Sequence, residues 1–121
     1  MKLAKTSPES PVYSPSGHLR MSRRRLVWEK IGAEYVEVSE AEMEVGGGKD
    51  MHSHENSEHI LYVIEGKLRV KGDKEEVEVE KGMAVLISPG ELHLPYNPGP
   101  GKAVFLVINA PPIPPRPKEL K

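Results

Sequence analysis

The chain has 121 residues, enough for one domain with a single core but too few for two independently folding units. Its 18 acidic and 17 basic residues nearly cancel, so no field of one sign favours nucleic acid or an anionic membrane, and a small molecule is the expected partner. Cysteine is absent, which excludes disulfides, a thiolate nucleophile and thiolate metal ligands. Any bound metal must therefore use nitrogen or oxygen ligands.

The first segment, residues 1–17, contains three prolines and lacks the apolar stretch of a signal peptide. No stretch of the chain is long and apolar enough to span a bilayer. We therefore expect an extended N-terminal arm and a cytoplasmic location. Glutamate and lysine are abundant and glutamine is absent, a bias found in proteins from hot environments.

Short runs rich in valine, isoleucine, leucine and tyrosine recur between glycine and proline residues, and helical periodicity is hard to find. This pattern predicts an all-β protein. In chain order, the predicted strands are residues 25–31, 34–38, 41–45, 59–64, 68–70, 76–80, 83–87 and 103–108. The predicted turns between them include residues 46–48, 65–67, 72–74, 81–82 and 97–101.

The predicted strands differ in how their faces are covered. Residues 76–80 alternate glutamate and valine, which predicts one wet face and one buried face. Residues 60–64 and 104–108 are apolar at both odd and even positions, so both faces of these strands should be buried. Another part of the protein, or a partner, must then cover the face that is turned away from the core. The N-terminal strands or a second copy of the chain could do so, and we predict a homodimer on that ground. The barrel domain is expected at residues 18–110, and the proline-rich residues 111–121 are expected to form an extended arm or a frayed end.

Four of the five histidines fall in residues 51–59 and 89–93. His52 and His54 are two residues apart, so on an extended chain both imidazoles point to one face and can hold one ion. His59 and His93 lie at the ends of predicted strands, where barrel mouths place their chemistry. Because a firmly held metal ion needs three or more protein donors, we predict one divalent metal ion bound by these histidines.

Two basic features match no site. His18 is expected in a solvated loop. The three consecutive arginines of residues 23–25 could bind an anionic partner, but a short basic run is more often a solvated face or a salt-bridge patch at a dimer interface.

The histidine segments resemble the cupin superfamily. Its first motif reads glycine, five residues, His-any-His, three or four residues, glutamate, six residues, glycine, and Gly46, His52, His54 and Gly66 fall in that register.

The second cupin motif reads glycine, five residues, Pro-any-Gly, two residues, histidine, three residues, asparagine. Gly82, Gly90, His93 and Asn97 match it, while Ser88 occupies the position of the proline. Together the motifs cover residues 46–97. The resemblance implies an antiparallel jelly-roll β-barrel of six to eight strands with one metal ion in its mouth. Asn97 is expected to stabilise the turn into Pro98.

One departure from the first motif concerns a metal ligand. The position separated from Gly66 by six residues, a glutamate in the family pattern, is His59, and Glu58 is its neighbour. Strand alternation lets only one of the two face the metal. Counting from Gly66 selects His59, whereas a slip of one residue would select Glu58.

Neutral imidazoles suit zinc, iron, nickel, copper and, less well, manganese, so the ligand set does not identify the metal. Four neutral ligands leave the charge of the ion uncompensated, so the site should attract a small anionic or enolisable organic molecule. With the oxygenases of the cupin family as the model, the leading hypothesis is a metal-dependent oxidoreductase of the dioxygenase type. Glu58, Glu91 and Tyr96 are the candidate acids or bases.

Two other functions stay open. A metal-dependent isomerase of the sugar-phosphate type would need a basic phosphate pocket, for which Lys67, Arg69 and Lys102 are the available residues. A non-enzymatic module that binds a small molecule would need no acid or base. Residues before Gly46 carry no helix-turn-helix pattern, so direct DNA binding is not expected.

Overall fold

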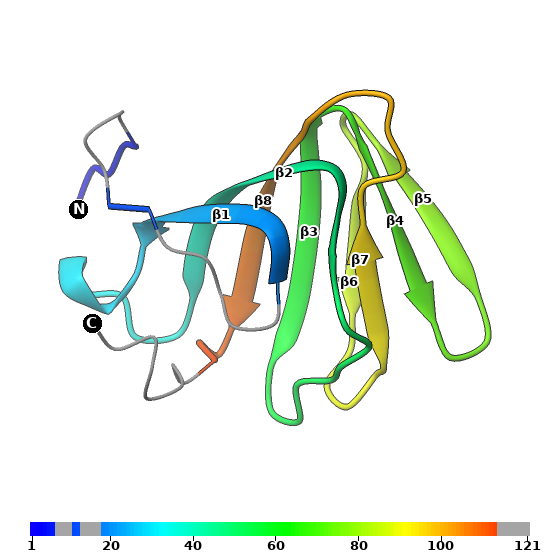
Figure 1. Cartoon of the computed structure of the whole chain (residues 1–121). Coiled ribbons are helices and arrows are strands. Elements are labelled where there is room, and N and C mark those ends of the chain that lie inside the picture. The colour runs from blue at the N-terminus through cyan, green and yellow to red at the C-terminus, as the bar shows by residue number, and fades with distance from the viewer. Residues whose placement is uncertain (7–10, 13–17, 114–121) are drawn as a thin grey trace.

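The protein is described by a computed structural model that covers residues 1–6, 11–12 and 18–113 (Figure 1). These residues form strands and one short 3₁₀ helix, η1 (Glu29–Ile31). The strands are β1 (His18–Val27), β2 (Glu37–Lys49), β3 (Glu58–Glu65), β4 (Lys67–Gly72), β5 (Glu76–Glu80), β6 (Ala84–Ile87), β7 (His93–Tyr96) and β8 (Ala103–Ala110). Every strand pairing among the described residues is antiparallel. The predicted all-β jelly-roll barrel is thus confirmed.

The strands form one curled sheet in the order β5-β4-β7-β2-β8-β3-β6, and β1 pairs with β2 outside this path. The long strand β2 connects the two halves of the sheet, because it pairs with β1 and β8 over most of its length and with β7 at Gly48. Figure 1 shows β1 and β2 on one side of the molecule and the β4–β5 hairpin on the other. The result is an incomplete barrel whose path ends at β5 and β6.

The three glycines of residues 46–48 lie inside β2, and the turn predicted there is wrong. Gly46 has a φ of 82°, a left-handed conformation that glycine adopts easily. A Cβ atom on Gly48 would lie 3.1 Å from the Cβ of Tyr96 and 3.2 Å from the carbonyl oxygen of Pro95. The glycines therefore let β2 bend and approach β7 closely, as a bulge or barrel corner requires.

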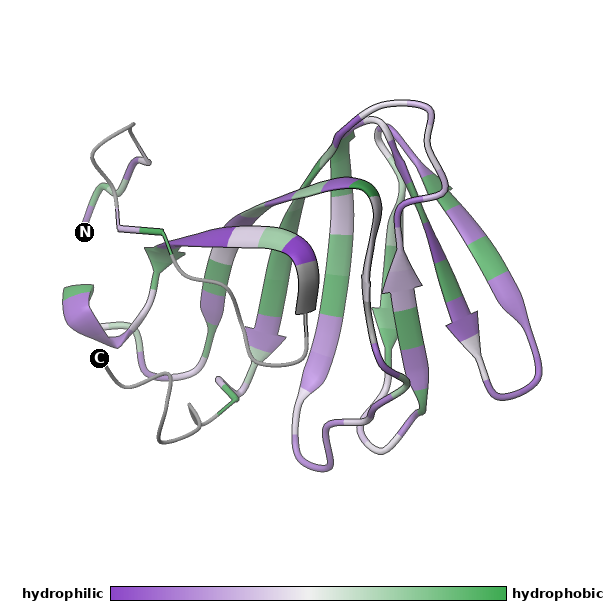
Figure 2. Cartoon of the chain, viewed as in Figure 1, coloured by the Kyte–Doolittle hydropathy of each residue, from purple (hydrophilic) through white to green (hydrophobic). Residues whose placement is uncertain are grey.

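The core lies between the two halves of the curled sheet. Buried and less buried residues alternate along β8 from Ala103 to Asn109. On β5, apolar and polar residues alternate in the same way, as the bands in Figure 2 show. Phe105 pairs with Val63, and Val107 pairs with Leu61, so buried side chains of β3 and β8 meet in rows. Each such buried side chain contributes roughly 1.5–3 kcal/mol of hydrophobic stabilisation. The buried apolar core is Met21, Ala41, Met43, Leu61, Val63, Leu68, Val70, Val79, Ile87, Ala103, Phe105 and Val107.

Toward one end of the barrel the inward face becomes polar. The inward position of β8 that follows Val107 is Asn109, which pairs with His59 of β3. Both side chains are buried, and so is Ser39 of β2. The apolar core therefore ends in a polar row, and the predicted site lies at this end.

Two further expectations are corrected. The strand expected at residues 25–31 ends at Val27, before η1, and begins at His18, whose backbone pairs with Lys49. His18 is thus in a strand and not in a loop. The strand β7 was not predicted, because Pro95 cannot donate to a ladder and interrupts the strand pattern.

The expected N-terminal arm at residues 1–17 and tail at residues 111–121 lie mostly outside the described residues. Among the described residues, none of the helices has the length and apolar character needed to cross a membrane.

Candidate metal centre

The segment that follows β2 runs beside the start of β7 and is tied to it by backbone hydrogen bonds. The N–H of His52 donates to the carbonyl of His93 at 3.0 Å, and the N–H of His93 donates to the carbonyl of His52 at 2.8 Å. The N–H of Gly90 donates to the carbonyl of His54 at 2.9 Å. Two segments that are far apart in the sequence thereby hold three histidines in one register.

The side chains of these three histidines converge. One potential ligand atom from each of His52, His54 and His93 lies within 4.8 Å of the other two. The ring centroid of His52 lies 4.8 Å from that of His54 and 4.1 Å from that of His93. The ring centroids of His54 and His93 are 5.4 Å apart. Within the part of the chain that the structure describes, this group consists of histidines alone.

Backbone carbonyls determine which ring nitrogen faces inward. The Nδ1 of His52 lies 2.8 Å from the carbonyl oxygen of Asp50, and the Nδ1 of His93 lies 2.9 Å from that of Glu91. Because a carbonyl oxygen only accepts hydrogen bonds, each Nδ1 must donate, and the lone pair of each neutral ring is then at Nε2. Metal-binding histidines commonly have their second nitrogen oriented in this way.

His59 adds a fourth ring beside the cluster. Its ring centroid lies 5.2 Å from that of His54 and 5.4 Å from that of His93. His59 is buried on the inward face of β3, whereas its neighbour Glu58 is exposed. Burial is the main cause that lowers the pKa of His59 to about 3, although its hydrogen bond to Asn109 acts in the opposite direction. The ring is therefore neutral near pH 7, as a metal ligand must be.

The donor set fits a divalent transition metal ion. Three convergent imidazoles, with a fourth alongside, give neutral nitrogen donors of the kind that zinc, copper, iron and nickel accept. His52, His54 and His93 could form a site of this kind, and His59 faces the same space.

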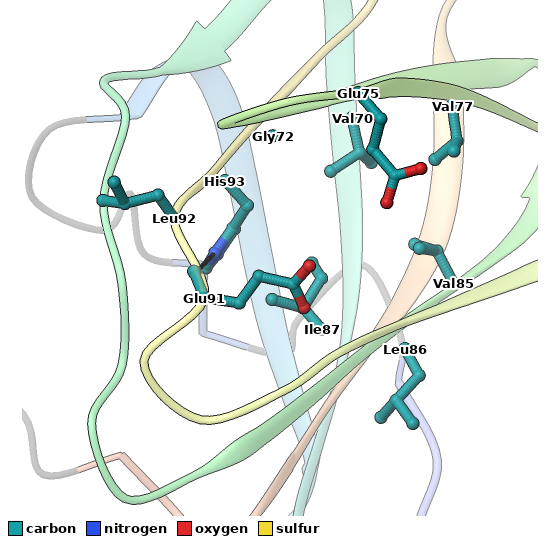
Figure 3. A pocket seen from close by; sticks show the side chains of 10 residues that line it. All are labelled: Val70, Gly72, Glu75, Val77, Val85, Leu86, Ile87, Glu91, Leu92 and His93. Carbon is teal, nitrogen blue, oxygen red and sulfur yellow. Dashed lines mark hydrogen bonds between the residues drawn. The ribbon is translucent and has the colours of Figure 1, made fainter.

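A pocket of about 360 Å³, counting the part open to solvent, lies beside His93 (Figure 3). Residues of β4, β5, β6 and β7 line it, and most of them are apolar. Two carboxylates, those of Glu75 and Glu91, also line it. The Oε1 of Glu91 accepts a hydrogen bond from the backbone N–H of Ser88 at 3.0 Å. Of the three candidate acids or bases, Glu91 lines this pocket together with His93 of the cluster.

The structure does not bring Tyr96 to the histidines. Along β7 the buried positions are His93 and Pro95, so the side chain of Tyr96 lies on the opposite face. There its hydroxyl donates to Oε1 of Glu76 at 3.1 Å. The same alternation directs Glu58 away from the barrel interior.

The basic residues considered for a phosphate pocket also lie elsewhere. Lys67 and Arg69 on β4 form ion pairs with Glu78 at 3.7 and 3.2 Å, and Lys102 pairs with Glu42 at 2.6 Å. Glutamates on neighbouring strands therefore neutralise the three cations that the isomerase hypothesis needed.

Sequence reasoning missed three polar residues on the inward face. Arg23, Ser39 and Asn109 are all buried, and Arg23 donates to the hydroxyl of Ser39 at 3.2 Å. Asn109 could have been found, because it continues the inward parity of Ala103, Phe105 and Val107. The sequence does not show which of the three consecutive arginines, residues 23–25, is buried.

Asn97, a motif residue, has the structural role that was expected. Its Nδ2 donates to the carbonyls of Met43 at 2.8 Å and Gly101 at 2.9 Å, and its Oδ1 accepts from the N–H of Gly99 at 2.8 Å. These bonds close the loop between β7 and β8 and confirm that Asn97 stabilises the turn into Pro98.

Fold and site together define a small antiparallel jelly-roll barrel with a histidine cluster that could hold a metal ion. Residues 39–109, more than half of the chain, match the family described as Cupin domain. The chain belongs to this family.

The chain is also similar to individual proteins. It is 32% identical over 99 residues to the tetracenomycin polyketide synthase protein TcmJ of Streptomyces glaucescens. The aligned residues cover 80% of this chain and 64% of that protein. It is 35% identical over 75 residues to the uncharacterized protein MJ1618 of Methanocaldococcus jannaschii, covering 62% of this chain and 60% of that protein. The matches therefore span less than two thirds of the length of these relatives.

Solved structures share the fold. The polyketide cyclase RemF from Streptomyces resistomycificus superposes with a TM-score of 0.81 at 26% identity, covering 95% of this chain and 83% of that one. A predicted oxalate decarboxylase from Thermotoga maritima superposes with a TM-score of 0.79 at 17% identity, covering 92% and 100% of the two chains. The second likeness shows the fold alone.

Proposed function

We propose that this protein is a metal-dependent enzyme that acts on a small enolisable organic molecule, such as a β-diketone or a phenol. Its metal ligands are His52, His54, His59 and His93. The observation that carries the proposal is the convergence of three imidazoles, with the ring of His59 alongside and without a carboxylate in the group. Such a set leaves the charge of a divalent ion uncompensated, which favours an anionic oxygen ligand.

A divalent ion held there would supply a Lewis acid that stabilises the negative charge of an enolate or phenolate oxygen. The chain's own residues would orient the ligands, bind the substrate and transfer a proton. The carbonyls of Asp50 and Glu91 orient the rings of His52 and His93, which would reduce the rearrangement needed when a substrate binds. The apolar lining of the pocket beside His93 suits a carbon skeleton, and Glu91, which also lines this pocket, would accept a proton from a carbon atom of the substrate.

The reaction that we favour is ring closure within a chain of β-carbonyl groups. One relative is named a polyketide synthase protein, and one solved structure is named a polyketide cyclase. Polyketide chains are rows of enolisable β-carbonyl groups. In such a ring closure a carbon atom loses a proton, forms a bond to a carbonyl carbon of the same molecule, and water leaves, so no oxidant is consumed.

Oxygenation by a dioxygenase is the second candidate. The apolar pocket beside His93 supports it, because dioxygen partitions into apolar space, and imidazole sites also accept iron and copper. This reaction would consume one dioxygen per turnover and would require a redox-active metal.

One experiment separates these functions. The full chain is loaded with zinc or with iron and mixed with a linear β-triketone, under nitrogen and in air. Cyclised product from the zinc-loaded chain under nitrogen, lost in His93→Ala, would support ring closure. Oxygen uptake by the iron-loaded chain alone would support the dioxygenase. If neither form perturbs the enolate absorption of the triketone, the site does not act on such molecules.

We also propose that a second copy of the chain covers the outer face of β3, β6 and β8. The outward residues there are apolar and meet in register, since Ile60 pairs with Leu86 and Ile108, and Tyr62 pairs with Leu106. Tyr62 is 39% exposed and Leu86 is 56% exposed. An apolar face of this kind is typical of an interface.

A further inference from the structure

The three consecutive arginines of β1 have three different environments. Arg24 forms an ion pair with Glu42, with Nη1 and Oε2 3.6 Å apart. Arg25 pairs with Glu37 at 3.3 Å, and its guanidinium lies 4.7 Å from the ring centroid of Trp28. Arg23 differs from both, because it is buried with a relative exposure of 9% and donates from Nη2 to the hydroxyl of Ser39 at 3.2 Å.

The side chain of Arg23 is directed toward the histidine end of the barrel. Its Cα pairs with Ala41, in the same row of the sheet as the core residue Phe105. Its guanidinium, however, contacts Ser39, which lies one inward row closer to Asn109 and His59. Arg23 is thus an inward-facing cation beside the polar row of the site.

Electrostatics agree with this placement. Burial is the largest cause that lowers the pKa of His59, and the positive charge of Arg23 is among the further causes. A metal ion in the same interior would add a second positive charge in a region where solvent screens charges weakly.

We propose that Arg23 is a substrate-binding residue for a carboxylate. The substrate would carry an enolisable group at one end, for the metal, and a carboxylate at the other end, for the guanidinium. A planar guanidinium matches a carboxylate in shape and donates two parallel hydrogen bonds to it. This inference rests on the function proposed above and narrows it to enolisable organic acids.

The hydroxyl of Ser39 has a positioning role in this arrangement. It is fully buried and accepts a hydrogen bond from Nη2 of Arg23, so it limits the directions in which the long arginine side chain can point. A guanidinium that is oriented in advance loses less conformational entropy when a carboxylate binds.

The test compares two probes that share one chelating group. Acetylacetone is a β-diketone, and succinylacetone is a β-diketone that carries a terminal carboxylate. Calorimetry would measure the dissociation constant of each probe for the zinc-loaded full chain. We expect succinylacetone to bind about 10- to 100-fold more tightly than acetylacetone, the range expected for a charge-assisted pair.

Variants identify the residue that causes this preference. In Arg23→Met the preference for succinylacetone over acetylacetone should disappear. In Arg24→Met, the matched control on the outer face, the preference should persist. Arg23→Lys should keep part of the preference for succinylacetone, and Ser39→Ala should weaken that preference severalfold. These two variants test the proposal if Arg23→Met does not fold.

The possible results separate the inference from the function on which it rests. If the zinc-loaded chain binds both probes equally, and Arg23→Lys and Ser39→Ala leave both constants unchanged, Arg23 is not the carboxylate-binding residue but the metal site still takes enolisable molecules. If the zinc-loaded chain binds neither probe, the proposed function and the inference are both overturned.

Discussion

His59 and Asn109 pair across β3 and β8, and Nδ1 of His59 donates a hydrogen bond to Oδ1 of Asn109. This bond fixes the ring orientation of His59 and leaves the lone pair of the neutral imidazole at Nε2. The rings of His52 and His93 are fixed in the same way by backbone carbonyls. Asn109 therefore does with a side chain what the backbone does for the other two histidines.

Replacing Asn109 should weaken metal binding without removing a ligand. We expect Asn109→Leu to lower the affinity for zinc about 10- to 100-fold, the usual effect of losing a partner that orients a ligand. Competition with a chromophoric chelator would measure it. Asn109→Asp is the matched control, because a carboxylate still accepts the hydrogen from Nδ1. Equal losses in both variants would contradict an orienting role for this residue.

Metal should stabilise the folded chain, since the ligands are brought together only by folding. At a free ion concentration a thousand times the dissociation constant, the free energy of unfolding should rise by about 4 kcal/mol. Thermal unfolding with zinc and with a chelator would show this as a shift in the midpoint. The shift should vanish in His52→Ala and His93→Ala, and a shift that survives in both would exclude the proposed centre.

The same assay decides between His59 and Glu58 as the fourth ligand. The ring of His59 faces the cluster and Glu58 is exposed, so His59→Gln should reduce the zinc-dependent shift. Glu58→Gln, the matched control at the neighbouring position, should leave it unchanged. The opposite pattern would show that the strand slips by one residue when metal binds.

Much of this architecture could be predicted from sequence, because strand alternation and the glycine spacings of the two cupin motifs are local features of the chain. The alternation of residues 76–80 gives β5 directly, and the spacing of His52, His54 and His93 indicates that they share one site. Each strand pattern and each motif depends on spacings within one short segment of the chain.

What could not be predicted depends on contacts between distant segments. Gly48 resembles a turn residue until the close approach of Tyr96 is known, and β7 contains a proline that argues against a strand. Tyr96 was a candidate acid or base, but strand alternation places it on the other face beside Glu76. Arg23 appeared to be one of three equivalent surface cations, and its burial and its contact with Ser39 distinguish it.

The apolar outer face should hold two copies of the chain together. Leu86→Glu would place a charge opposite Ile60 on that face, so we expect it to convert a dimer into a monomer at micromolar concentration. Light scattering after size-exclusion chromatography would measure the mass. Tyr35→Glu is the control, because Tyr35 is 80% exposed and precedes β2. A wild-type chain that is monomeric at high concentration would rule out this interface.

Acid should destabilise the metal-free chain partly through His59. Burial, as the main cause, lowers the pKa of His59 from 6.5 to about 3, so the unfolded chain binds a proton at this residue at a higher pH than the folded chain does. Above pH 6.5 neither state carries that proton, and the contribution of the neutral ring to stability is complete. As the pH falls from 6.5 toward 3, the unfolded state is favoured by about 1.4 kcal/mol per pH unit from this one group.

Denaturant titrations in the presence of a chelator would measure the free energy of unfolding at several pH values within that window. The protein's carboxylates also titrate there, so the informative quantity is the difference between the wild type and His59→Gln. We expect the variant to lose less stability than the wild type as the pH falls. Parallel curves would show that His59 takes up its proton equally easily in the folded and unfolded chains, and hence that its ring is not held in a dry interior.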